Sequence, residues 1–172
     1  MARALPEALP RALVVTPRAR AAAERHRLGV GPGDAVGILV GRALGRRRSS
    51  VAVASRFLPL TNAAPDPARH FRIEAADLAR ALAHAARRGQ AALAVLHSHG
   101  AGPARASAPD VAGAWPELLT VVAGGSGGWR AFALRLKGGR RALVTVPLVL
   151  GLARRGSARA DAARPRRRAE AP

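Results

Sequence analysis

The stretch HSHGAGPARASAPD, His97 to Asp110, sets two histidines one residue apart directly after the apolar run Ala91 to Leu96. A short apolar run flanked by turn residues predicts a buried strand. Residues two apart at the end of a strand point to the same side, so His97 and His99 can offer their imidazoles to one ion while Ser98 faces away. We therefore expect a pair of potential metal ligands at the end of a buried strand.

The second half of this stretch has the pattern of a helix start. Ser107 suits an N-cap and Pro109 suits the first turn, which lets Asp110 face the two histidines. Two imidazoles and one carboxylate leave a fourth tetrahedral position for water, which is the arrangement of a catalytic zinc site. The simpler alternative is a polar loop after a strand, since a His-x-His pair alone is not specific. The chain has no cysteine, so any metal site must use histidine and carboxylate ligands.

The surrounding periodicity predicts an α/β or α+β domain, in which a mixed β-sheet is flanked by two main helices. The helices are expected over residues 17–28 and 74–89, the second closed by Gly89 as a C-cap. Strands are expected at 12–16, 35–41, 51–60, 91–96, 118–123, 129–136 and 141–150. The second and third of these should pair, and GGSGG should form a hairpin turn between the fifth and sixth.

Length and composition limit the organisation of the chain. Its 172 residues fit one domain, which we assign to residues 1–152. From residue 153 onward the apolar periodicity stops, and the mixture of arginine, alanine and proline predicts a disordered tail. The sequence contains no apolar run of membrane-spanning length and no segment of signal-peptide type. Together with the absence of cysteine, this favours a cytoplasmic protein.

The net charge of +19 raises the alternative of a nucleic-acid-binding protein. Nearly all the cations are arginine, Lys137 being the one lysine, in a chain dominated by alanine, glycine, proline and arginine. We interpret the charge as compositional drift of a GC-rich gene. Neither Arg46–Arg48 nor Arg164–Arg168 is interleaved with aromatic residues that would stack on bases. Nucleic acid is therefore disfavoured as the partner.

Several motifs resemble those of one known family. The string H-S-H-x7-S-x-x-D, His97 to Asp110, resembles the zinc signature H-[ST]-H-P-x6-S-x-x-D of the JAMM family, the catalytic MPN-domain metallopeptidases. PGDAVGILVG, Pro32 to Gly41, is similar to the P-x-E-x-C-G-L-L-x-G segment of that family. PLTNAAPDPARHFRI resembles the Asn-containing loop and R-x-F element of its short bacterial members. The resemblance covers about Leu13 to Leu136 and implies an MPN/JAMM-like, cytidine-deaminase-like fold.

The resemblance also implies roles for individual residues. His97, His99 and Asp110 would bind Zn²⁺, and Ser107 would help to stabilise the tetrahedral intermediate. Asp34 stands where the family has its general-base glutamate, and its carboxylate is shorter by one methylene, about 1.5 Å of bond length. A misplacement near 1 Å can cost about a hundredfold in rate.

Two residues could compensate for the shorter side chain of Asp34, and a third position departs from the family pattern. Gly33 precedes Asp34, and its permissive backbone is one possible source of compensation. Glu24 is a conceivable replacement base, although a solvated charge on a helix face is the simpler interpretation. Gly100 replaces the family's proline, which predicts a looser loop after the second ligand.

The remaining histidines and the tryptophans suggest no second site. His26, His70 and His84 have no partner at ligand spacing and are expected at the surface or in loops. Trp115 and Trp129 are expected to pack in the core.

The resemblance implies a zinc-dependent peptidase or isopeptidase that cuts after the diglycine C-terminus of a ubiquitin-like protein. For short bacterial chains of this type, the implied substrates are ubiquitin-like sulfur-carrier proteins. The alternative is a catalytically weakened or inactive MPN-type binding module, motivated by Asp34. The complete set of zinc ligands favours the enzyme.

Overall fold

The computed structural model describes residues 9–31, 33–45 and 50–151. The predicted tail at 153–172 and the Arg46–Arg48 loop lie outside the described residues, and the predicted domain limits stay a prediction. The helices in the described part are α1 (Pro17–Gly29), α2 (Ala75–Ala86) and α3 (Ala108–Gly113). The strands are β1 (Ala12–Val15), β2 (Val36–Leu44), β3 (Val51–Leu60), β4 (Ala91–His99), β5 (Leu119–Gly124), β6 (Trp129–Lys137), β7 (Arg140–Val146) and β8 (Leu148–Leu150).

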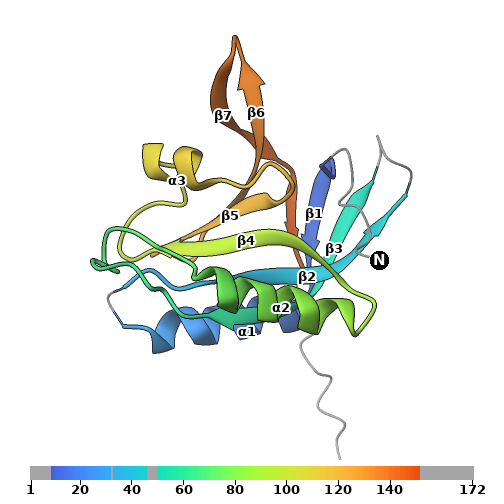
Figure 1. The fold of residues 1–172 in the computed structure, drawn as a ribbon, viewed down its shortest axis with the longest axis horizontal. Coiled ribbons are helices and arrows are strands. Elements are labelled where there is room, and N and C mark those ends of the chain that lie inside the picture. Colours follow the sequence, from blue (N-terminus) through green and yellow to red (C-terminus); the bar gives the residue numbers. More distant parts are fainter. Residues whose placement is uncertain (1–8, 32, 46–49, 152–172) are drawn as a thin grey trace, which may run out of the picture.

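All of these strands belong to one mixed sheet, in the order β7-β6-β5-β4-β2-β3-β1-β8. β2 and β3 pair, and β5 and β6 form a hairpin, as the sequence predicts; both pairs are antiparallel, whereas β4 and β5 run parallel. The parallel pair needs a crossover between its strands, and this crossover is the segment that contains Ser107, Asp110 and α3. The predicted fold class, a mixed sheet with two main helices, is confirmed. Figure 1 also shows that β6 and β7 project from the body of the sheet as a hairpin.

The sheet curls because the strands at its two ends are consecutive in the chain. β7 pairs with β6, while β8 pairs in parallel with β1 at the other end of the strand order. Only Pro147 separates β7 from β8, and its carbonyl accepts a hydrogen bond from the Leu13 amide at 2.9 Å. The prediction of a single strand over 141–150 was therefore wrong. Pro147 has no amide hydrogen to continue the ladder, so the strand breaks there and changes neighbours.

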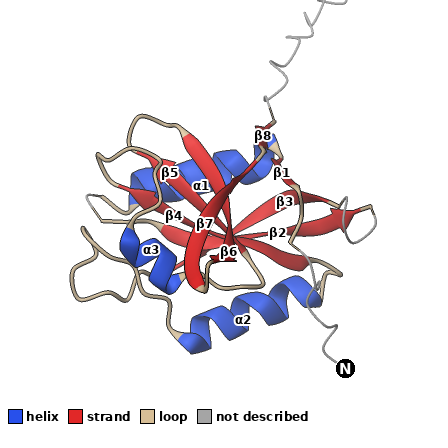
Figure 2. Ribbon diagram, turned by 90° about the horizontal axis from the view of Figure 1, so that it is seen from above, coloured by secondary structure: helices blue, strands red, loops and turns tan. Residues whose placement is uncertain are grey.

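The two main helices cover opposite faces of the sheet, as Figure 2 shows. On one face, Ala19 and Ala23 of α1 pack in a core that includes Leu39 of β2 and Leu96 of β4. On the other face, α2 contributes Ala85 to a core formed by Val36, Ile38, Val40, Val95 and Leu118. Because side chains alternate along each strand, β2 and β4 supply apolar residues to both cores. This burial on both faces explains why their sequences are nearly continuous apolar runs.

The helix ends follow the predicted signals with small shifts. Thr16 caps α1, its Oγ1 accepting a hydrogen bond from the Ala19 amide at 3.3 Å, and Pro17 occupies the first turn. α2 ends at Ala86, and Gly89 adopts a φ of +64° in the turn that leads to β4. The prediction of Gly89 as the C-cap was therefore wrong, because Arg87 takes that position and Gly89 turns the chain two residues later. None of the described helices is long and apolar enough to cross a membrane.

Candidate metal centre

The two histidines lie on β4, which extends to His99 instead of ending at Leu96. Val95, His97 and His99 alternate with residues that face the α1 core, so the histidines point to the α2 side of the sheet. Ser98 faces the other way, where its Oγ accepts a hydrogen bond from the Ala35 amide at 2.8 Å. The predicted division of this tripeptide, with two ligands on one side and the serine on the other, matches the structure. His97 is fully buried, whereas His99 is partly exposed.

The third candidate ligand, Asp110, lies on α3, whose N-cap is Ser107 as predicted. The Ser107 Oγ accepts from the Asp110 amide at 3.4 Å, and the Asp110 Oδ2 accepts from the Ser107 amide at 2.6 Å. This reciprocal pair is a capping box, with Asp110 in the place that glutamate or glutamine usually takes. The Ser107 hydroxyl also lies 2.7 Å from Asp110 Oδ2. Helix capping therefore holds the Asp110 carboxylate in a fixed direction, toward β4.

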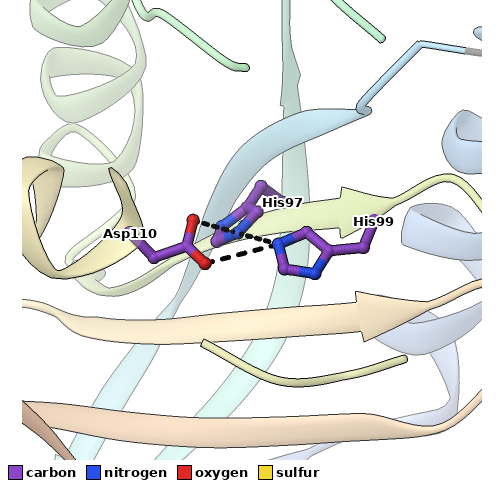
Figure 3. A group of neighbouring side chains, drawn as sticks. All are labelled: His97, His99 and Asp110. Atoms are coloured by element: carbon purple, nitrogen blue, oxygen red, sulfur yellow. Dashed lines mark hydrogen bonds and ion pairs between the residues drawn. The ribbon is translucent and has the colours of Figure 1, made fainter. Parts of the chain in front are cut away.

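His97, His99 and Asp110 converge on one point, as Figure 3 shows. The two Nε2 atoms are 3.2 Å apart, His97 Nε2 is 2.9 Å from Asp110 Oδ1, and His99 Nε2 is 3.3 Å from Asp110 Oδ2. Zinc binds imidazole and carboxylate at about 2.0 to 2.2 Å, so two ligand atoms on a tetrahedron are about 3.3 Å apart. The separation of the two Nε2 atoms matches that spacing, and each histidine approaches a different oxygen of the Asp110 carboxylate. These three residues could therefore hold one metal ion.

The surroundings of the histidines suit this role. The Nδ1 of His99 lies 3.2 Å from the carbonyl oxygen of Pro103. A proton on Nδ1 satisfies that carbonyl and leaves the Nε2 lone pair free to bind a metal. The ring of His97 stacks on Phe71, with their centroids 4.5 Å apart. Phe71 belongs to the R-x-F element noted in the sequence analysis. Nothing in that pattern indicated that this phenylalanine orients His97.

The Asp110 carboxylate carries its charge although it is buried. Burial by itself raises the pKa of this group, but hydrogen bonds from His97 and Ser107 and the charge of His97 hold the pKa well below its usual range. The side chain is 5% exposed. An ionised, desolvated carboxylate beside two imidazoles is a strong donor set for a divalent cation.

Asp34 lies just before β2 and borders the same site. It is buried, and its Oδ1 accepts a hydrogen bond from the Gly100 amide at 3.3 Å. Burial is the largest cause of a raised pKa at Asp34, opposed by that hydrogen bond and by the charges of His97 and His99. The structure thus brings Asp34 to the metal ligands, as the sequence resemblance implies.

The backbone of Asp34 is anchored by the loop that follows β3. Its amide donates to the Pro67 carbonyl at 2.6 Å, and its carbonyl accepts from Asn62 Nδ2 at 3.0 Å. Asn62 also accepts from the amides of Ala64 and Arg72 through Oδ1, at 3.0 and 3.1 Å. One asparagine side chain therefore ties this loop to the base of Asp34. Gly33 is not among the glycines with a positive φ, so anchoring by Asn62, and not backbone freedom, sets the position of Asp34.

These groups line a cleft of about 410 Å³ between α3 and the loop before α2. Asp34, His99, Ser107 and Asp110 form one part of its wall. The rest is formed by Arg69, His70, Phe71, Arg72, Ile73, Pro109, Gly113 and Trp115. A partly apolar cleft with a few convergent polar groups is the usual form of a small binding or active site.

Other sequence predictions need correction. Glu24 is not a solvated charge, because its two oxygens accept hydrogen bonds from Trp129 Nε1 at 2.7 Å and Arg27 Nε at 2.8 Å. It lies on α1, on the face of the sheet opposite the site, so it cannot replace Asp34 as a base. Trp129 packs in the core, as predicted. His26 is not a surface histidine, because its ring packs against Phe57 and its Nε2 is buried.

The fold and the site together define a class: a mixed α/β domain with a His-x-His and aspartate metal centre beside a buried acidic residue. A protein-family model described as "Prok-JAB: Prokaryotic homologs of the JAB domain" matches residues 16–135. This match spans most of the chain, and the chain belongs to that family.

Comparison with known structures agrees with this fold. The chain is similar to the solution structure of protein DSY2949 from Desulfitobacterium hafniense, with 24% sequence identity and a TM-score of 0.69. That similarity covers 80% of this chain and 92% of the other. No curated protein matches the chain significantly. Family membership and the ligand set support a metal-dependent hydrolase as the coarse functional class.

Proposed function

We propose that this protein is a zinc-dependent peptidase or isopeptidase that cuts after the diglycine C-terminus of a ubiquitin-like sulfur-carrier protein. The observation that carries the proposal is the convergence of His97, His99 and Asp110 beside the buried carboxyl group of Asp34. Three protein ligands leave one position open, which is the difference between a catalytic and a structural zinc site.

The chemistry divides between the ion and the side chains. Zinc bound by these residues would polarise the scissile carbonyl and lower the pKa of water. Asp34 accepts the proton of the attacking water on its carboxylate and delivers it to the leaving amine. Burial raises the pKa of Asp34 in the metal-free protein, and zinc bound beside it would lower that pKa again.

Ser107 has a supporting part in the proposal. Its hydroxyl group caps α3 and touches Asp110, while the residue also lines the cleft. We assign it the role of hydrogen-bond donor to the oxyanion that forms on the scissile carbonyl. To donate there, the hydroxyl rotates away from Asp110 Oδ2, which keeps its bond from the Ser107 amide at 2.6 Å.

The size of the cleft supports a narrow substrate tail. A volume of about 410 Å³ accepts a short extended segment. Glycine lets a backbone approach a recessed group most closely, because it has no Cβ atom. The choice of a sulfur carrier rests on the sequence resemblance to short bacterial family members.

The test is cleavage of a sulfur carrier fused after its diglycine to a short peptide, with zinc-loaded protein and mass-spectrometric detection. We expect one cut, directly after the second glycine. The His99→Ala variant serves as the blank. Absence of cleavage over a panel of carriers, with zinc demonstrably bound, would reject the enzyme.

A non-catalytic binding module is the second candidate, and the shortened carboxylate of Asp34 favours it. In that case zinc and the carrier bind but the fusion stays intact. The Asp34→Glu variant separates the two candidates. Cleavage that appears only in Asp34→Glu supports the module, while cleavage by the unaltered protein supports the enzyme.

A further inference from the structure

The two positions at which this chain departs from the JAMM pattern contact each other. Asp34 replaces the glutamate and Gly100 replaces the proline of that pattern, and the Gly100 amide donates to Asp34 Oδ1 at 3.3 Å. A proline at position 100 would have no amide hydrogen to donate. This hydrogen bond is therefore possible only because glycine, and not proline, occupies position 100 beside Asp34.

We propose that the Gly100 amide positions the Asp34 carboxylate, so that the two departures form a matched pair that restores a working base. The inference rests on the proposed function, since it assigns Gly100 a part in the same reaction. Gly100 is a positioning residue that acts through Asp34.

The geometry explains why the shorter side chain needs this donor. The backbone of Asp34 is held on both sides, by Pro67 and by Asn62, so it cannot advance toward the metal ligands. A buried carboxylate oxygen without a donor is unfavourable, because burial removes the water that would otherwise hydrogen-bond to it. The Gly100 amide provides the donor at Oδ1 and leaves Oδ2 for proton transfer.

The position of this donor is tied to a metal ligand. Gly100 directly follows His99, and the loop beyond it is held by hydrogen bonds from the Gly102 amide to His99 and from the Gly125 amide to Gly102, both 2.9 Å. Gly100 is also not among the described glycines that adopt a positive φ. The feature that the site uses is the amide hydrogen of residue 100, and alanine keeps that hydrogen.

The activity test is a double-mutant cycle on the zinc-loaded protein with the carrier fusion as substrate. We expect Gly100→Pro to lower kcat by about tenfold or more, as loss of a positioning donor does, with KM unchanged. Gly100→Ala keeps the amide hydrogen and should retain activity within about twofold. In the Asp34→Glu background, Gly100→Pro should lower kcat by less than about threefold. Glutamate at position 34 and proline at position 100 are the pair of residues in the family pattern.

A second measurement does not depend on activity. Gly100 is exposed, so protection of its amide against hydrogen exchange in the metal-free protein reports on the bond to Asp34. We expect Asp34→Ala to accelerate exchange at Gly100 by about tenfold, whereas Asp34→Asn, which keeps Oδ1, should not. Zinc affinity, measured by competition with a chelator, should be the same in Gly100→Ala and in the unaltered protein.

The outcomes separate this inference from the proposed function. Equal losses from Gly100→Pro in both backgrounds, or an equal loss from Gly100→Ala, would overturn the pairing while leaving the enzyme intact. Unchanged exchange at Gly100 in Asp34→Ala would overturn it as well, even if Gly100→Pro fails to fold. If no variant, Asp34→Glu included, cuts any carrier, the proposed function fails, and with it the catalytic meaning of the pair.

Discussion

The Nε2 atoms of His97 and His99 lie 3.2 Å apart, and each also approaches one oxygen of the Asp110 carboxylate. The capped α3 and the end of β4 hold these three groups together. A divalent ion between them would be bound by all three side chains at once, which leads to the first prediction.

Zinc should stabilise the protein through these three side chains. At a zinc concentration about 100-fold above Kd, binding to the native state alone adds about 2.7 kcal/mol to the free energy of unfolding. Thermal denaturation with and without zinc measures this gain. His99→Ala should abolish it, whereas His84→Ala should keep it, because the His84 ring on α2 contacts Arg88 and is not in the ligand group. A gain that survives in His99→Ala would place the ion elsewhere.

Asp110→Asn should destabilise the metal-free protein at neutral pH. The folded-state pKa of Asp110 lies below the ordinary value, so the ionised carboxylate contributes stability in full above the unfolded pKa of about 3.9. That contribution is lost as the pH falls from there through the folded pKa. We expect Asp110→Asn to cost about 1 to 3 kcal/mol at pH 7, as loss of charged hydrogen bonds does. Urea unfolding at pH 7 and near pH 3 should show the difference shrinking.

Asp34→Asn should have the opposite effect on stability. Burial raises the folded-state pKa of Asp34, so the ionised group opposes folding at pH values above that raised pKa, and the penalty vanishes as the pH falls toward the unfolded value. The variant keeps the Oδ1 acceptor for Gly100 and should unfold at a higher temperature than the metal-free parent at pH 7. It should also lose hydrolysis. A lower unfolding temperature at pH 7 would contradict the raised pKa.

The fold was largely predictable because hydrophobic periodicity and turn residues mark most element boundaries. β3 has the expected limits, and α1 ends one residue from its expected position. The exception is the run RALVTVPLVL, which was predicted as one strand although Pro147 cannot continue a ladder of hydrogen bonds. Which neighbour a strand pairs with depends on long-range closure of the sheet, and local sequence carries no information about that closure.

The candidate site was predictable where motifs carry its members. His97, His99, Ser107 and Asp110 lie within one short stretch, and Asp34 belongs to a second motif that the family resemblance indicates. The stacking of Phe71 on His97 and the bond from Gly100 to Asp34 join distant segments. The second of these involves a backbone amide, which no residue pattern displays. Sequence reasoning could have noticed only that glycine, unlike proline, provides such a donor.

Glu24 should prove to be structural. Its carboxylate accepts from the buried indole of Trp129 and from Arg27, so Glu24→Ala should leave a buried donor without a partner and cost about 1 to 3 kcal/mol. Zinc affinity and hydrolysis, measured below the unfolding temperature of the variant, should be unchanged. Trp129→Phe combined with Glu24→Ala should cost less than the sum of the single variants. Loss of hydrolysis in a folded Glu24→Ala protein would instead make Glu24 a base.

Gly125→Ala should weaken metal binding although residue 125 touches no ligand. Gly125 lies just beyond β5, in the segment expected only to form a hairpin turn, and the loop after His99 packs directly on it. A Cβ atom at this position would overlap the carbonyl oxygen of Gly100 and lie 2.8 Å from the Cα of Ala101. These neighbours are backbone atoms, so the loop itself must shift, and with it the Gly100 amide and the Pro103 carbonyl that orient Asp34 and His99. Loss of such supporting contacts typically reduces metal affinity by about 10- to 100-fold.

Gly128→Ala is the matched control, since a Cβ atom there has no heavy atom within 4 Å. Chelator competition on both variants measures the effect, and equal zinc affinities would show that the loop adapts without moving the ligands.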